Sequence, residues 1–169
     1  MTVTRLVCQV SKTRDSQNTH ALRFDLFLGS RRPANVPGFS ILLNKLQATK
    51  LEKLQADKKA AGLGDKLVGY AHLHLEPRKT IRWTAFRPFG SSIAAVRNVP
   101  TRYGIGTIVH GAITEYLAKQ YPRHRIRHDA VVSWPRQQQL TAMGIASWQF
   151  YPMKTYARTV RQYTQMKNE

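Results

Sequence analysis

Two glycines placed just before an amphipathic segment are the clearest chemical feature of this 169-residue sequence. Gly104 and Gly106 stand one residue apart, and the run that follows, to Leu117, repeats apolar residues at helical spacing. The first N–H groups of a helix have no intrahelical partner, and the helix dipole makes that end positive. Glycines there would let a phosphate approach the backbone. A tight strand-to-helix turn is the alternative, because Gly-x-Gly alone is a weak signal.

Ionisable side chains also recur along the segment 65–77, which alternates in the manner of a strand. His72 and His74 share one predicted face, and Glu76 follows at the end of the segment. Histidine titrates near neutrality, so this row could relay protons. A half-exposed sheet face without chemistry is the alternative.

Two further residues are candidates for acid–base work. Asp129 lies on the strand predicted after the glycine-led helix, and Tyr151 follows the next short helix. A carboxylate can accept a proton, and a phenol can donate one to a leaving group. No set of ligands has the spacing typical of a metal site, and Cys8 is the only cysteine, so an intrachain disulfide is excluded.

The charge balance is strongly basic. Lys and Arg number 27 against 9 Asp and Glu, which gives a formal net charge of +18. Such a surface attracts polyanions, although solubility or a general compositional bias would also explain it. The sequence has no membrane-length apolar run and no signal-peptide core, so we expect a cytoplasmic protein without a membrane partner.

Hydrophobic periodicity predicts a single α/β domain over 1–169. Strands are predicted at 2–10, 65–77, 79–89, 91–99 and 125–133. Helices are predicted at 20–29, 39–62, 105–121 and 135–145. A turn is predicted at 11–18, a loop at 30–38, and a terminal strand or hairpin at 146–159.

The stretch "AAVRNVPTRYGIGTIVHGAITEYLAKQYP" resembles the central motif of the GCN5-related N-acetyltransferase family. Val96 matches the valine that usually ends the preceding strand, and Gly-Ile-Gly-Thr at 104–107 matches the common opening of the helix. The segment 131–145 resembles the motif that follows, and 65–75 resembles the second strand of the family. The close resemblance covers 96–145.

The resemblance implies an acetyl-CoA-dependent N-acyltransferase with a mixed, mostly antiparallel central sheet flanked by helices. It implies a motif core at 96–145, with a helical N-terminal part over 20–62. In such a protein, backbone amides at the helix start hold the pyrophosphate of acetyl-CoA. The residues expected to bind this cofactor are Val96, Arg102, Tyr103, Gly104, Ile105, Gly106, Thr107 and Ser133.

The sequence departs from the family pattern at three positions. Thr101 replaces the usual Arg or Gln, with Arg102 one place later, Leu140 replaces a tyrosine that often acts as general acid, and Ser133 replaces a frequent Asn. Three readings therefore stay open. The first is an acetyltransferase whose amine acceptor belongs to an acidic molecule or is linked to nucleic acid. The second is a catalytically inactive relative that binds DNA, RNA or protein. The third is an enzyme that modifies nucleic acid.

The segment "YPRHRIRH" at 121–128 adds a dense basic cluster. Such a cluster could grip the 3′-phosphate of coenzyme A or a nucleic-acid backbone. A solvated strand edge, protected from pairing by its charges, is the alternative.

Overall fold

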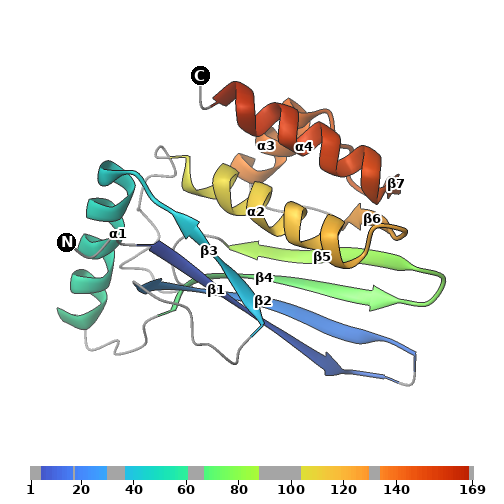
Figure 1. Ribbon diagram of the computed structural model, residues 1–169, viewed down its shortest axis with the longest axis horizontal. Coiled ribbons are helices and arrows are strands. Elements are labelled where there is room, and N and C mark those ends of the chain that lie inside the picture. The colour runs from blue at the N-terminus through green and yellow to red at the C-terminus, as the bar shows by residue number, and fades with distance from the viewer. Residues whose placement is uncertain are drawn as a thin grey trace. The chain divides into compact units, whose positions relative to one another are not determined.

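The computed structural model describes residues 5–16, 18–29, 37–60, 67–87, 104–129 and 134–167. Figure 1 labels the elements. The strands are β1 (Arg5–Arg14), β2 (His20–Gly29), β3 (Gly38–Leu42), β4 (Leu67–Glu76), β5 (Thr80–Arg87), β6 (Arg125–His128) and β7 (Tyr151–Pro152). The helices are α1 (Lys45–Ala60), α2 (Ile105–Gln120), α3 (Trp134–Met143) and α4 (Met153–Lys167). The predicted α/β class is confirmed, whereas the strand predicted at 91–99 lies outside the described residues.

The strands form one seven-stranded mixed sheet in the order β3-β1-β2-β4-β5-β6-β7. β1 pairs antiparallel with β3, and Arg5 stands opposite Leu42. β5 pairs in parallel with β6, with Thr80 opposite Arg125. β6 pairs antiparallel with the short β7. Because parallel neighbours need a crossover connection, α2 lies in the chain between β5 and β6, as a β-α-β unit requires.

The prediction of a helix at 20–29 is wrong, because this segment is strand β2. Leu22, Phe24 and Leu26 are buried, while Arg23 and Asp25 between them are half-exposed and joined by an ion pair of 2.8 Å. Burial therefore alternates with the strand period of two. The predicted turn at 11–18 also begins too early, because β1 continues to Arg14.

The helix predicted at 39–62 begins later than expected, because residues 38–42 form strand β3. A capping box sets the actual start of α1. The Asn44 side-chain oxygen accepts a hydrogen bond from the Gln47 N–H at 2.8 Å, and the Gln47 side chain accepts one from the Asn44 N–H at 3.1 Å. Two N–H groups at the helix start are thereby satisfied. In the described residues of 20–62, the expected helical N-terminal part is thus two strands followed by one helix.

A tight turn at 77–79 joins β4 to β5. Arg78 and Lys79 have positive φ values of 64° and 55°. Two-residue hairpin turns need this left-handed backbone because it matches the twist of the two strands. The hairpin fixes the register in which β4 and β5 present their side chains.

The terminal strand or hairpin predicted at 146–159 is largely wrong, because only Tyr151–Pro152 is extended and α4 begins at Met153. Met153, Tyr156, Ala157 and Val160 are buried at the i, i+3, i+4 and i+7 positions of this helix. The helix predicted from Ile105 is confirmed as α2, and the short helix before Gly144 is confirmed as α3.

The chain forms two compact units. The first consists of Met1–Ser11, Arg23–Ala71 and Phe86–Gly106, and the second of Lys12–Leu22, His72–Ala85 and Thr107–Glu169. Buried residues of the first unit include Leu6, Cys8, Phe24, Leu26 and Leu51. Buried residues of the second include Leu73, Ile81, Ile113, Leu117, Ile126 and Tyr156. Of the helices described, none is long and apolar enough to cross a membrane.

Candidate active site

One face of β4 carries the ionisable row that the sequence predicts. His72, His74 and Glu76 are half-exposed, whereas Leu73 and Leu75 between them are buried. The His72 and His74 rings meet edge to face, with centroids 4.9 Å apart. Strand alternation thus places the row at the surface of the second unit, where a ligand can reach it.

His74 is oriented by Asp15, a residue from the turn between β1 and β2. The His74 Nδ1 atom lies 3.1 Å from the Asp15 Oδ2 atom, although the two residues are 59 positions apart. Hydrogen bonds from the Thr19 hydroxyl and then from His74 lower the pKa of the Asp15 carboxyl. This contact occupies Nδ1, so Nε2 is the ring nitrogen that remains for a ligand.

Glu76 lies beside a second carboxylate, because Arg82 on β5 bridges the two. Its Nε atom lies 3.0 Å from the Glu76 Oε1 atom and 3.5 Å from the Asp129 Oδ2 atom. Asp129 follows β6 directly, and its backbone N–H donates to the Trp83 carbonyl at 3.0 Å. The Asp129 carboxylate lies on the outer side with Arg82 and Arg127, at 3.5 and 3.8 Å, a point that sequence alternation left open.

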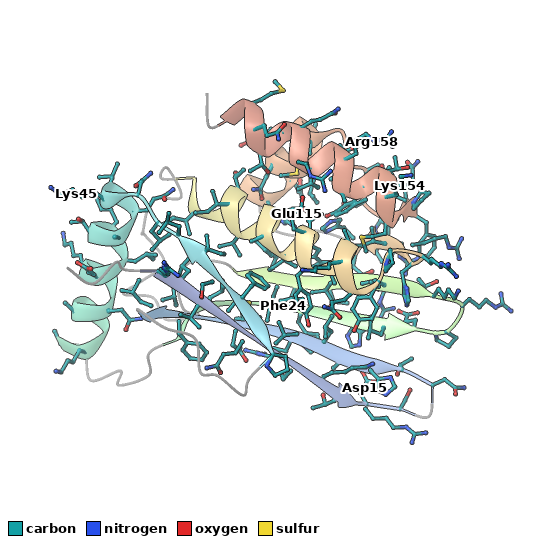
Figure 2. All side chains as sticks on the ribbon, in the orientation of Figure 1. Asp15, Phe24, Lys45, Glu115, Lys154 and Arg158 are labelled. Atoms are coloured by element: carbon teal, nitrogen blue, oxygen red, sulfur yellow. The ribbon has the colours of Figure 1, made fainter. Side chains whose placement is uncertain are left out.

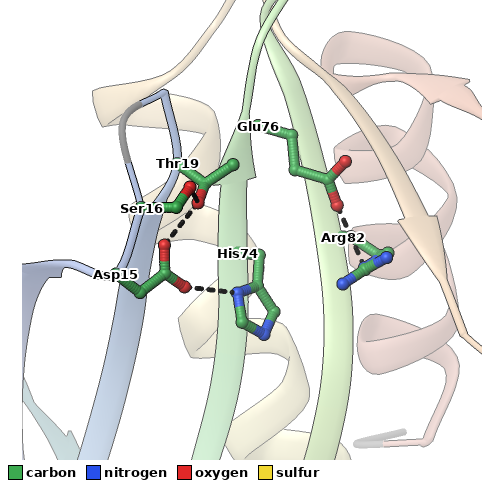
Figure 3. A pocket seen from close by; sticks show the side chains of 6 residues that line it. All are labelled: Asp15, Ser16, Thr19, His74, Glu76 and Arg82. Carbon is green, nitrogen blue, oxygen red and sulfur yellow. Dashed lines mark hydrogen bonds and ion pairs between the residues drawn. The ribbon is translucent and has the colours of Figure 1, made fainter.

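His74, Glu76 and Arg82 border a surface hollow of about 370 Å³ (Figure 3). Its lining consists of Asp15, Ser16, Thr19, His74, Glu76 and Arg82. Within the described residues, the buried Glu76 Oε1 and Arg82 Nε atoms have no hydrogen-bond partner, although they form an ion pair. Both atoms are buried, so the ion pair between them is the contact that compensates their charges.

The electrostatics of this hollow differ from those of the chain as a whole. The protein has a net charge of +18 and only 9 acidic residues. Asp15 and Glu76 nevertheless line the same hollow, and Asp129 adjoins it through Arg82. A cationic amine would find carboxylate oxygens here, next to a histidine that can accept its proton.

Tyr151 is held in a different setting from the ionisable row. Its hydroxyl accepts a hydrogen bond from the Ala146 N–H at 2.8 Å, and its ring lies 6.4 Å from that of Tyr156. It is not among the residues that line the hollow. Leu140 is 2 % exposed and belongs to the core. It stands where the N-acetyltransferase family, which the sequence resembles, often has a catalytic tyrosine.

The glycine turn before α2 has a left-handed backbone at Gly104. Gly104 is exposed with a φ of +71°, and α2 begins at the next residue without an acidic side chain in its first turn. Among the described residues, a Cβ atom at Gly104 would meet only the Gln47 side chain, at 4.0 Å. Ile105 is buried and anchors the helix start, and Gly106 is half-buried.

Other expected cofactor residues are only partly described. The Thr107 hydroxyl accepts a hydrogen bond from the Gln139 side chain at 3.2 Å, which ties the first turn of α2 to α3. Val96, Arg102, Tyr103 and Ser133 lie outside the described residues.

A buried polar network in the second unit was not predicted from the sequence. The Tyr156 hydroxyl lies 2.8 Å from the His110 Nε2 atom and 2.6 Å from the His128 Nε2 atom. Arg136 lies 2.7 Å from the His110 Nδ1 atom, and the Trp83 ring stacks on both histidines. His110 falls on the buried side of α2 with Ile113 and Leu117, and that spacing was the one available signal.

No family model, characterised protein or solved structure that we compared with the chain matches it. In the parts of the chain that the structure describes, no group of three or more His, Cys, Asp or Glu side chains is arranged to hold a metal ion. The functional assignment therefore depends on the residues themselves.

Proposed function

We propose that this protein is an acetyl-CoA-dependent N-acyltransferase that transfers an acetyl group to an amine. The observation that carries the proposal is the start of α2. A glycine at positive φ precedes a helix that is free of acidic side chains in its first turn, in a connection between two parallel strands. This arrangement supports a phosphate-binding turn, and the sequence around it resembles the acetyl-CoA motif of the N-acetyltransferases.

The residues of this turn fit the cofactor. Backbone N–H groups at Ile105, Gly106 and Thr107 would hold its pyrophosphate, because the first amides of a helix lack intrahelical partners. The described residues leave space at Gly104 for an anion close to the backbone. When bound, acetyl-CoA supplies a thioester whose acetyl carbon an amine attacks, so that a C–N bond forms and a C–S bond breaks.

The chain's own acid–base groups are those of the hollow. Nε2 of His74 would accept the proton that the attacking amine loses and return it to the coenzyme A thiolate that leaves, while Asp15 holds the ring in the tautomer with its proton on Nδ1. Asp15 also stabilises the imidazolium that forms, as an orienting carboxylate does. Glu76 adds a negative charge to the lining of the hollow, which suits a cationic amine.

Thermal unfolding with and without acetyl-CoA tests the binding half of the proposal. A ligand that binds only the native state raises the melting temperature, by several degrees at about 100 times Kd for a domain of this size. Gly104→Asn tests the turn, because asparagine tolerates positive φ while its side chain fills the open space. Gly144→Asn is the matched control, since Gly144 has a φ of +77° and nothing lies within 4 Å of its added Cβ.

We expect Gly104→Asn to abolish the thermal shift and Gly144→Asn to preserve it. No shift of the unaltered protein at millimolar acetyl-CoA would refute cofactor binding. An equal shift in both variants would show that Gly104 serves only to form the turn.

Release of the coenzyme A thiol in the presence of a panel of amines tests the catalytic half. We expect His74→Gln to lower turnover by about 100- to 10,000-fold, the usual contribution of a general base. His20→Gln is the control, because His20 lies outside the lining of the hollow. Retained acetyl-CoA binding without turnover for any amine would favour a non-catalytic binding protein.

A further inference from the structure

The outer face of β6 and the turn before β7 carry a cluster of arginines and aromatic rings. We propose that this cluster, the aromatic–arginine surface formed by Arg125, Arg127, Trp148 and Phe150, binds single-stranded nucleic acid. This binding function goes beyond acyl transfer and does not depend on it.

The arginines reach this surface because β6 alternates strictly. Ile126 and His128 are buried, at 0 % and 2 % exposure, whereas Arg125 is exposed and the Arg127 side chain is 21 % exposed. Successive strand side chains point to opposite faces, so the two arginines project together from the outer face. Within the basic segment 121–128, strand β6 therefore has two side chains that point inward and two that point outward. The outward pair is Arg125 and Arg127.

Aromatic rings lie against both guanidinium groups. Arg125 lies 4.8 Å from the ring centre of Phe150, and Arg127 lies at the same distance from that ring. Arg127 also lies 5.1 Å from the ring centre of Trp148. These contacts are within the range of cation–π attraction, and they hold the flexible arginine side chains in place. Rings and cations thus form a preordered surface.

Trp148 is the exposed aromatic ring of the cluster. Its side chain is 56 % exposed, and its backbone has a φ of +67°, which residues other than glycine rarely adopt. A hydrogen bond of 2.8 Å from its N–H to the His128 carbonyl secures it against β6. The Trp148 ring is therefore both anchored against Arg127 and open to solvent, which leaves it available to stack with a ligand.

The combination fits single strands better than duplexes or acidic proteins. Unpaired bases stack on exposed aromatic rings and on guanidinium planes, while the backbone phosphates contact neighbouring cations. Bases in a duplex are already stacked and would leave Trp148 without a partner. The chain supplies further charge, with a net value of +18 and exposed Lys154 on α4 (Figure 2).

Binding of a fluorescently labelled oligo-dT of about 15 nucleotides, a length within known site sizes, tests the proposal by anisotropy. The same assay with a duplex of equal length and with poly-glutamate identifies the class of partner. We expect the single strand to bind most tightly, to quench tryptophan fluorescence, and to bind less tightly as salt rises from about 50 to 200 mM.

Trp148→Gly isolates the stacking contribution. Glycine accepts the positive φ without cost, so the variant should fold and melt within about 4 °C of the parent. We expect its affinity for the single strand to fall about 5- to 100-fold, whereas Trp148→Phe should retain most of the affinity. Arg158→Ala is the charge control, and it should change affinity less than about twofold.

Three results would overturn the proposal. One is a Trp148→Gly variant that folds and binds the single strand as tightly as the parent. Another is a duplex that binds as tightly as the single strand. The last is poly-glutamate that binds as tightly as the single strand and loses affinity in the Trp148→Gly variant. That result would assign the surface to acidic proteins.

Discussion

The hydroxyl of Tyr156 on α4 lies 2.6 Å from Nε2 of His128 on β6, and both side chains are buried. The protons of this network can be assigned from its donors. Arg136 can only donate, so Nδ1 of His110 accepts and its Nε2–H donates to Tyr156. The Tyr156 hydroxyl then has its own proton available to donate to His128. An ordered chain of hydrogen bonds therefore connects α3, α2, α4 and β6.

Tyr156→Phe should destabilise the protein by about 2 to 4 kcal/mol. The substitution keeps the ring but leaves a buried His110 donor and a buried His128 acceptor unsatisfied, at about 1 to 3 kcal/mol each. Denaturant unfolding measures the loss. Tyr151→Phe is the control, since its hydroxyl accepts one exposed backbone hydrogen bond, and it should cost less than about 1 kcal/mol. Equal losses in the two variants would contradict the network's role.

Stability should fall as the medium becomes mildly acidic. Burial first, and the Arg136 charge next, lower the pKa values of His110 and His128 well below that of free histidine. Below about pH 6.5 the unfolded chain takes up protons at these positions and the native protein does not. The free energy of unfolding should therefore drop by about 1.4 kcal/mol per pH unit for each histidine.

Chemical denaturation at several values between about pH 7 and pH 5 measures this slope. Replacement of His128 by asparagine should remove about half of it, because one of the two titrating groups is gone. A free energy of unfolding that stays constant over this range would show that the two buried histidines are protonated in the native state as well.

Gly111 should be needed for close packing between α2 and α4. A Cβ atom there would lie 3.1 Å from the Thr164 hydroxyl oxygen, tighter than most such contacts. We expect Gly111→Leu to cost about 1 to 3 kcal/mol through overpacking. Adding Thr164→Ala should recover part of the loss, because it removes the atoms that clash. Thermal or denaturant unfolding of the double variant checks this, and purely additive effects would speak against contact between the two sites.

Cys8 should be unreactive in the native protein. Its side chain is 0 % exposed, and burial first, then the charge of Asp25, raise the pKa of the thiol. Because the thiolate is the reactive form, a thiol reagent should modify Cys8 only after denaturation. Rapid modification of the folded protein would indicate that β1 opens locally.

The site was predictable from the sequence in part. Alternation along residues 65–77 identifies His72, His74 and Glu76 as one face, because a strand's period is local. Asp15 was not predicted as a site residue. It lies 59 positions from His74 in the chain, and no local sequence pattern around Asp15 indicates their contact. Glu76 and Asp129 are connected through ion pairs with Arg82. The pairing of β5 with β6 places Arg82 between them, and that pairing is not visible in the local sequence.

Segments whose periodicity is long and regular were determined by the sequence alone. The apolar stripe from Ile105 to Leu117 defines α2, and the alternation at 65–77 defines β4, because local geometry and hydrophobic pattern agree there. Strand β2 and helix α4 were decided by tertiary structure. β2 takes its place between β1 and β4 in the sheet, and α4 buries Tyr156 against the histidines of α2 and β6. Those partners lie far apart in the chain, so only the folded protein joins them.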